Sequence, residues 1–353
     1  MGKIDFNKRE ILRHVGDFSQ ILGFKDYTLN GGKSQGVRAI DVKNGSGLEF
    51  TVLADRAMDI AWLSYKGCNL SYISKTGIVS PVYYNEVGTH FFRSFSAGFL
   101  TTCGLLNVGS PGIENGEQLG LHGRISNTPS EAVSYDMEWI EGIPTLRVKG
   151  KMREAKVFGE NVTLNREMIT KGGENKIKIR DTVENNGFRN EPIMLLYHFN
   201  LGYPLLDENA YLEIPSIKVT PRDAEAEKGI GHYDVLQGPT HGYSEQVFYH
   251  DVKAKNNGKT SVALINEKLA LAVAIHFNKN ELFNLTQWKQ MGEGEYVLGI
   301  EPCNCFVEGK EDSKNKGVLE YLKPGEIRTF EVEIEIVDGI NEIQRIKNDI
   351  TEI

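Results

Sequence analysis

Short runs of alternating apolar and polar residues recur along most of this 353-residue chain. In residues 328–337, Phe330, Val332, Ile334 and Ile336 fall on one face and the carboxylates on the other, because side chains alternate across a strand. Similar runs, separated by Gly- and Asn-rich turns, predict strands at 36–42, 48–53, 60–65, 145–153, 161–170, 175–185, 210–219, 260–266, 268–277, 295–301 and 327–337. Since no helical crossovers separate them, we expect an all-β fold, a sandwich of large antiparallel sheets.

Helix signals are confined to the two ends of the chain. Residues 5–14 predict a short helix with Asp5 as N-cap and Ile11 on its apolar face. Residues 341–348 predict a last helix, with Ile343 on its apolar side. We therefore expect a helix content below about 15%, against about a third in an average globular protein.

No internal repeat, low-complexity linker or compositional break divides the chain. We expect a single domain over residues 1–353, in which 1–34 is a lead-in and 339–353 carries the C-terminal helix. The longest polar stretches, 221–242 and 309–317, are interpreted as surface insertions rather than domain boundaries.

Composition narrows the class of protein further. With 40% hydrophobic and 25% charged residues the chain is typical of globular proteins, and its net charge is −8. Since no Lys/Arg run is present, a nucleic-acid partner is not expected. Residues 1–5 carry charges where a signal peptide needs an apolar core, and no run of 18 apolar residues follows. These features predict a cytoplasmic protein with no membrane partner.

Four cysteines, Cys68, Cys103, Cys303 and Cys305, are few for this length. We expect reduced thiols and no disulfide framework. Cys303 and Cys305 lack the spacing of common zinc knuckles, and no second Cys/His pair accompanies them. No metal and no other cofactor is predicted.

Two polar residues interrupt apolar segments where catalysis could take place. The apolar run 192–196 predicts a buried strand, and His198 follows it, just before Gly202 ends the run. A lone histidine there is most often structural. However, Glu301 interrupts a second apolar segment in the same way. A carboxylate and an imidazole that meet in one cleft make an acid/base pair usable near neutral pH.

Further donors gather in two stretches, 91–105 and 120–129. The first is too rich in Gly, Ser and Thr for a plain core strand and lacks the motifs of a phosphate-binding loop. Arg93, His122 and Arg124 could each be packing or surface residues, but together they suit a polyol site. Gln287 and Trp288 could add a hydroxyl contact and a stacking face, although Trp288 could equally belong to the core.

In their order along the chain, Leu121-His122-Gly123, Tyr197-His198-Phe199-Asn200-Leu201 and Glu301 resemble the signature of the aldose 1-epimerases, or galactose mutarotases. The likeness spans about residues 35–337, and Thr101-Thr102-Cys103-Gly104 resembles a divergent branch of that superfamily. The resemblance implies a β-supersandwich fold. It also implies that His198 is the general acid, that Glu301 is the general base, and that His122 and Arg93 position the sugar.

The chain departs from the family pattern at several points. Leu-His-Gly-Gly becomes Leu121-His122-Gly123-Arg124, and the extra guanidinium of Arg124 suggests an acidic or otherwise modified sugar. The family's sugar-binding aspartate has no clear counterpart. The predicted activity is the interconversion of α and β anomers of a monosaccharide or sugar derivative by acid/base ring opening. A catalytically silent sugar-binding or sensing protein, or another sugar epimerase or lyase, remains the alternative, and the sequence leaves open whether the protein forms a homodimer.

Overall fold

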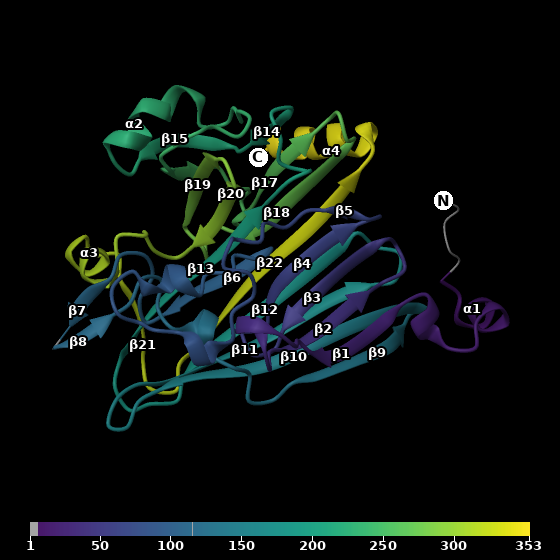
Figure 1. Ribbon diagram of the computed structural model, residues 1–353, viewed down its shortest axis with the longest axis horizontal. Coiled ribbons are helices and arrows are strands. Elements are labelled where there is room, and N and C mark those ends of the chain that lie inside the picture. The colour runs from purple at the N-terminus through teal and green to yellow at the C-terminus, as the bar shows by residue number, and fades with distance from the viewer. Residues whose placement is uncertain (1–5, 115) are drawn as a thin grey trace.

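The computed structural model describes residues 6–114 and 116–353 (Figure 1). Strands make up 48% of the structure and helices 14%, so the predicted all-β class and low helix content are confirmed. Neighbouring strands pair antiparallel throughout the three large sheets of the described residues. None of the helices in these ranges has the length and apolar composition needed to span a bilayer.

The three large sheets contain five, eight and seven strands. The five-stranded sheet has the order β1 (Gly23–Thr28), β2 (Arg38–Lys43), β3 (Leu48–Leu53), β4 (Asp59–Tyr65), β5 (Cys68–Asn69). The eight-stranded sheet has the order β14 (Ala210–Glu213), β17 (Lys259–Asn266), β18 (Leu271–Asn278), β22 (Ile327–Asp338), β12 (Lys176–Asn185), β11 (Asn161–Lys171), β10 (Ile143–Ala155), β9 (Ser134–Ile140). The seven-stranded sheet has the order β15 (Ser216–Pro221), β16 (Gln246–Val252), β19 (Asn284–Gly292), β20 (Glu295–Cys303), β13 (Glu191–Leu201), β21 (Glu320–Leu322), and β6 (Leu100–Leu105) pairs with β13.

The remaining elements are short. A separate hairpin consists of β7 (Gly112–Glu114) and β8 (Glu117–Leu119). The α-helices are α1 (Lys8–His14), α2 (Ala224–Gly229), α3 (Lys310–Asn315) and α4 (Ile340–Thr351). The 3₁₀ turns are η1 (Phe18–Gln20), η2 (Gly32–Ser34), η3 (Pro81–Tyr83), η4 (His90–Arg93), η5 (Ile125–Asn127) and η6 (Ile230–His232).

One apolar core draws side chains from all three large sheets. Phe50 of β3, Ile179 of β12, Phe330 of β22 and Tyr197 of β13 belong to it, and each is at most 3% exposed. In Figure 1 the five-stranded sheet lies over the part of the eight-stranded sheet formed by β9–β12. The inward positions of these sheets are the apolar positions of the alternating pattern, so burial of that apolar face holds the layers together.

A buried ionic cluster also joins the sheets. Arg166 of β11 is fully buried; it donates to Asp181 of β12 at 2.9 and 2.6 Å and to Asp59 of β4 at 2.7 Å. Tyr197 donates to the same Asp181, and Thr102 of β6 donates to Asp59. Through its two aspartates, the guanidinium therefore connects residues from all three large sheets.

Several predicted elements differ from those observed. The run 210–219 divides into β14 and β15, which enter different sheets, because Pro215 has no N–H and the chain turns there. Residues 100–105 form a fully buried strand, β6, although the stretch seemed too rich in Gly and Thr. The strand predicted at 192–196 continues to Leu201, so His198 lies within it rather than beyond its end.

The terminal helices largely follow the prediction. Helix α1 begins at Lys8, and the side chain of Asn7 caps it by accepting from the backbone N–H groups of Arg9 and Glu10. Asp5, the predicted cap, lies outside the described residues. Helix α4 buries Ile343 and its apolar neighbours against β17, β18 and β22. The polar stretches at 221–242 and 309–317 contain α2 and α3 respectively, which the sequence did not indicate.

Candidate active site

His198 and Glu301 meet on neighbouring strands of the seven-stranded sheet. The register of β13 and β20, which pairs Phe199 with Ile300 and Leu196 with Cys303, places the two residues opposite each other. His198 Nε2 lies 3.2 Å from Glu301 Oε1. Both residues are buried, with 5% and 2% of their surface exposed. The two polar interruptions of the sequence therefore form one acid/base pair.

The pair lies in a small cavity of about 120 Å³. Phe91, Phe95 and Trp288 form aromatic walls, and the ring centroids of Phe95 and Trp288 are 5.4 and 5.3 Å from that of His198. His122 lines the same cavity, with its ring centroid 6.0 Å from that of His198. Aromatic faces around a few polar groups are typical of pockets that bind small polar ligands.

Burial determines the protonation of the pair. Removal from water, with a smaller contribution from His122, lowers the pKa of His198 to about 3. Burial also raises the pKa of Glu301 well above its usual range. Burial thus favours a neutral imidazole and a neutral carboxyl group rather than an imidazolium and a carboxylate. In this state the imidazole can accept a proton and the carboxyl group can donate one.

The backbone constrains the tautomer of His122. The Gly109 N–H points at His122 Nδ1 over 3.3 Å, so Nδ1 is the acceptor and Nε2 carries the proton. Burial lowers the pKa of His122 to about 4, which keeps the ring neutral near pH 7. The backbone at His122 has a positive φ of 60°. His122 is therefore a neutral hydrogen-bond donor in the wall of the cavity.

A glycine leaves the space that the carboxyl group of Glu301 occupies. A Cβ at Gly299 would lie 2.6 Å from Glu301 Oε1 and 3.3 Å from His198 Cε1. It would also lie 2.9 Å from the Cβ of Trp288, which pairs with Gly299 across β19 and β20. A side chain at this position would therefore force the carboxyl group of Glu301 or the backbone near Trp288 to shift.

Two charged residues of the cavity were not among the predicted site residues. Arg222 Nη2 donates to Glu245 Oε1 at 3.2 Å and lies 2.9 Å from Asp223 Oδ2. Trp288 Nε1 donates to the other oxygen of Glu245 at 2.7 Å. Both charged residues lie at or near the ends of the polar stretch interpreted as a surface insertion. Only the pairing of β15 and β16, between residues distant in sequence, could have brought them to the cavity.

Of the other predicted residues, Trp288 lies in the cavity, whereas Arg93 and Gln287 do not. Trp288 lines the cavity, as a stacking face would. Arg93 is exposed at the end of η4 and does not line the cavity. Gln287 is fully buried, accepts from His250 at 3.0 Å and donates to the backbone carbonyl of Tyr233 at 2.7 Å. Because β-strand side chains alternate, Gln287 faces away from Trp288 and the cavity.

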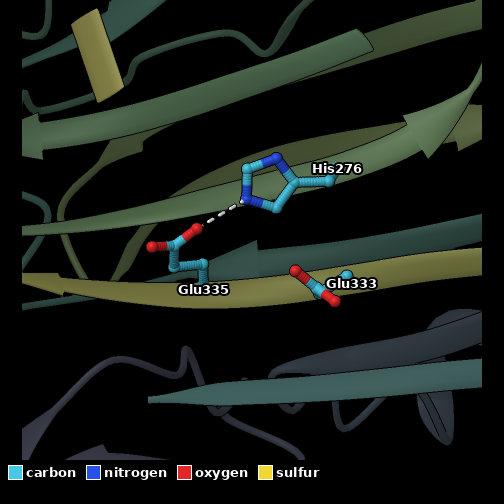
Figure 2. Close-up of side chains that lie close together, drawn as sticks. All are labelled: His276, Glu333 and Glu335. Atoms are coloured by element: carbon cyan, nitrogen blue, oxygen red, sulfur yellow. Dashed lines mark hydrogen bonds and ion pairs between the residues drawn. The ribbon is translucent and has the colours of Figure 1, made fainter. Parts of the chain in front are cut away.

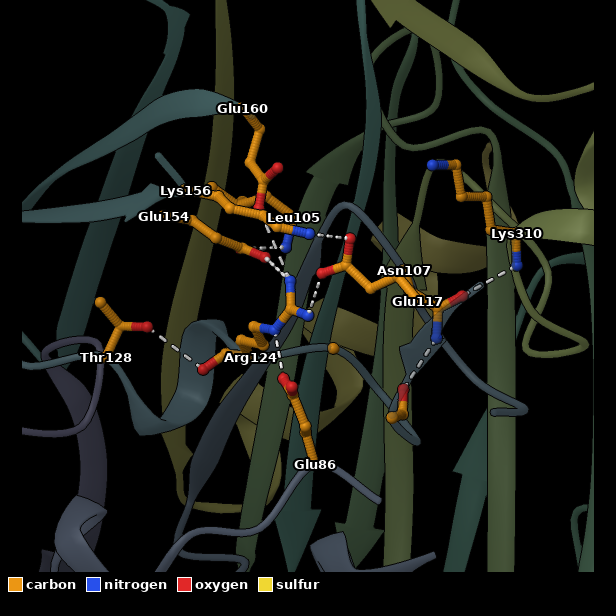
Figure 3. Close-up of polar contacts among 12 residues, drawn as sticks. Glu86, Leu105, Asn107, Glu117, Arg124, Thr128, Glu154, Lys156, Glu160 and Lys310 are labelled. Carbon is orange, nitrogen blue, oxygen red and sulfur yellow. Dashed lines mark hydrogen bonds and ion pairs between the residues drawn. The ribbon is translucent and has the colours of Figure 1, made fainter. Parts of the chain in front are cut away.

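Arg124 lies outside the cavity, in a cluster of carboxylates (Figure 3). Its guanidinium binds Glu86 and Glu117, and Nη1 lies 3.9 Å from Glu154 and 3.7 Å from Glu160. Four acidic neighbours already satisfy this cation. Its placement therefore does not support the expected role in selecting an acidic sugar.

The described residues bring three possible metal ligands together at another place, His276, Glu333 and Glu335 (Figure 2). His276 Nε2 lies 3.1 Å from Glu335, but Lys176 lies 2.8 Å from Glu333 and Arg345 pairs with Glu335 at 2.5 Å. These cations neutralise the carboxylates, so the group fits an ionic contact between α4 and the sheet better than a metal site.

All four cysteines are free.

Several solved structures with a similar fold are named as aldose 1-epimerases or galactose mutarotase-like proteins. A Klebsiella pneumoniae protein provisionally named an aldose 1-epimerase has a TM-score of 0.90 at 24% identity, covering 95% of this chain and 90% of that one. A galactose mutarotase-like protein from Clostridium acetobutylicum gives 0.64 at 16% identity, covering 90% and 99%. Galactose 1-epimerase from Lactobacillus acidophilus gives 0.60 at 14% identity, with the same coverage. The chain has the galactose mutarotase-like fold.

The sequence also matches a family profile over residues 34–336. The chain belongs to that family, which is described as Domain of unknown function (DUF4432). A search of curated proteins found no match.

Proposed function

We propose that this protein is an aldose 1-epimerase-like enzyme that interconverts the α and β anomers of a monosaccharide. The observation that carries the proposal is the buried pair of His198 and Glu301, 3.2 Å apart in an aromatic cavity. Glu301 Oε1 and His198 Nδ1 are buried and have no hydrogen-bond partner among the described residues. Buried polar atoms are rarely left unpaired, and the hydroxyls and ring oxygen of a sugar would satisfy them.

The reaction requires one acid and one base that can exchange roles. One group removes the proton of the anomeric hydroxyl while the other protonates the ring oxygen, and the C1–O5 bond breaks. After rotation about C1–C2, the two transfers run in reverse and the ring closes on the other face. A neutral imidazole beside a protonated carboxyl group meets this need, because the first can accept a proton and the second can donate one. His122 adds a fixed neutral donor.

The charges favour an uncharged sugar. Arg222, the cation of the cavity wall, is paired with Glu245 and Asp223. Arg124, which the sequence suggested for an anionic group, is held by other carboxylates. A carboxylate or phosphate on the substrate would have to compete with these existing partners. We therefore expect neutral aldoses to be handled better than uronic acids or sugar phosphates.

The first test measures exchange between the two anomeric protons by saturation-transfer NMR across a panel of neutral, acidic and phosphorylated sugars. Glu301→Gln and His198→Asn should each lower the exchange rate at least about a hundredfold, the scale of a positioned proton-transfer group. His276→Asn is the matched control, because His276 also faces a carboxylate, at 3.1 Å, but outside the cavity. Its exchange rate should equal that of the wild type.

The same experiment decides between the enzyme and a sugar-binding protein without turnover. Equal exchange in the wild type and in Glu301→Gln would remove Glu301 from the mechanism. Binding without exchange in the wild type, for every sugar of the panel, would favour the silent binding protein. Both residues of an acid/base pair are present, and binding alone does not require them, so we favour the enzyme.

A further inference from the structure

A second groove lies on the five-stranded sheet, away from the active site. It has a volume of about 190 Å³, and its lining comes from β1–β4 and the preceding turn η1. Trp62, Asp41, Lys25, Lys43 and Glu49 are among the residues that line it. None of its lining residues also lines the cavity of His198. The groove therefore requires a separate explanation.

The charged side chains of this groove are not paired with one another. The strand register places Lys25 opposite Asp41 and Lys43 opposite Glu49, yet no ion pair joins either couple within the described residues. On the eight-stranded sheet, the directly opposed Lys149 and Glu167 do form an ion pair, at 3.1 Å. The groove thus presents two positive and two negative groups that are not paired with one another, with no net charge; of these, Lys43 Nζ also donates to the backbone carbonyl of Gln20 at 3.3 Å.

One of the carboxylates is held in place. Tyr27 and Thr51 both donate to Asp41 Oδ1, at 2.9 and 2.6 Å. Asp41 Oδ2 accepts no hydrogen bond from a described residue. Burial and the contact with Asp41 raise the pKa of Tyr27 to about 12, so the phenol stays a donor near pH 7. A fixed carboxylate with one open oxygen is a ready acceptor for a hydroxyl group.

An aromatic side chain stands beside these polar groups. Trp62 of β4 is 36% exposed on the solvent-facing side of the sheet, where Thr51 and Ser64 are its polar neighbours in the groove. The indole Nε1 has no hydrogen-bond partner among the residues described. A tryptophan that offers both a ring face and an open N–H suits a ligand with apolar C–H faces and hydroxyl edges.

We propose that this groove is a second binding site and that its ligand is an uncharged saccharide. One sugar ring would stack on Trp62, adjacent hydroxyls would donate to Asp41 Oδ2 and Glu49, and the ammonium groups of Lys25 and Lys43 would donate to other hydroxyls. The balance of charges disfavours an anion or a cation, each of which would meet two like charges. The site does not depend on the activity proposed for the cavity.

The test uses the indole N–H signals of the full-length protein in ¹H–¹⁵N NMR spectra. The chain has three tryptophans, Trp62, Trp139 and Trp288, so Trp62→Phe and Trp139→Phe assign all three signals. Glucose, galactose, lactose and maltotriose are titrated to about 50 mM, because a stack with a few hydrogen bonds gives affinities of only about 1 mM. The Trp62 signal should shift and saturate, while that of Trp139 stays in place.

A second variant removes the acceptor without removing the ring. Asp41→Asn keeps a side chain that can still accept from Tyr27 and Thr51, and it should weaken the Trp62 response about tenfold, the loss of one charge-assisted hydrogen bond. A Trp62 signal that does not move with any sugar, or an equal response in Asp41→Asn, would overturn the proposal. A stronger response to glucose 6-phosphate than to glucose would also overturn it, as evidence of an anion site. Anomer exchange and the Trp288 signal report separately on the cavity.

Discussion

At the scale of single residues, the proton of the His198–Glu301 pair leads to a pH prediction. We expect kcat/KM for a neutral sugar to follow a bell in pH, because the active pair combines a neutral imidazole with a protonated carboxyl group. The acidic limb reports a second proton on the pair and lies low, since burial lowers the pKa of His198 to about 3. The basic limb reports loss of the carboxyl proton of Glu301, and burial moves this limb upward by raising the pKa of Glu301. These apparent values belong to the coupled pair.

Each substitution should remove one limb of that profile. Glu301→Gln should abolish the basic limb and His198→Asn the acidic one, measured as residual exchange rates between about pH 3 and pH 10. An acidic limb near the ordinary histidine value of about 6.5 would instead mean that water reaches the imidazole. That result would contradict the buried, neutral pair.

Residue identity pointed to His198, Glu301, His122 and Trp288, which share one cavity, but not to Arg222 and Glu245. His198 and Glu301 stood out because each interrupts an apolar segment, and a polar group in a core strand needs a reason. Arg222 and Glu245 gave no such signal, because they lie in a polar stretch where charges are ordinary. Arg124 also stood out in the sequence, and the structure places its guanidinium among four neighbouring carboxylates outside the cavity. The carboxylates around Arg124 come from separate parts of the chain, so only the folded structure identifies them as its partners.

At the scale of elements, the segment between β15 and β16 carries part of the cavity wall. Lys289 of β19 is 3% exposed and donates to the backbone carbonyls of His232 and Val235 at 2.9 and 2.6 Å. These bonds fasten the segment that begins after Arg222 and ends near Glu245. Lys289 is therefore a positioning residue for Arg222 and Glu245.

We expect Lys289→Met to raise KM about tenfold, because hydrogen bonds from a charged donor contribute about 1.5–3 kcal/mol. The value of kcat should change by less than about twofold, since the acid/base pair is untouched. Steady-state anomer exchange over a range of sugar concentrations separates the two constants. Lys75→Met, which removes an exposed lysine, is the control. An equal fall of kcat and kcat/KM would instead assign the segment a part in the transition state.

The pattern of burial explains which strands could be predicted. The strand β12 alternates strictly between buried and less buried positions, and β22 alternates up to Ile334, beyond which α4 also covers its second face. The alternation located both strands within a few residues. The strand β6 is buried throughout, so its sequence has no period of two, and its glycine and threonines obscured it. The edge strand β15 was merged with β14, because only Pro215 separates two runs of similar composition.

At the scale of the whole molecule, Arg166 connects the three large sheets. We expect Arg166→Met to lower the free energy of unfolding by about 3–5 kcal/mol, because Asp59 and Asp181 would remain buried without their cation. Urea denaturation measures the change. Arg180→Met is the control: Arg180 lies on the neighbouring strand in an exposed pair with Glu331 at 3.6 Å, and its loss should cost less than about 1 kcal/mol. If both variants lost the same free energy of unfolding, the buried ionic cluster would not stabilise the contact between the sheets.

The space left by Gly299 has a consequence for recognising relatives of this protein by sequence. A glycine two positions before the glutamate is a condition for seating the carboxyl group beside the imidazole, since even a methyl group would collide with Glu301. Among proteins of this fold, Gly-x-Glu near the C-terminal end should therefore mark chains able to carry out proton transfer. Chains that keep the glutamate but replace the glycine are candidates for descendants that retain the architecture and have lost the chemistry.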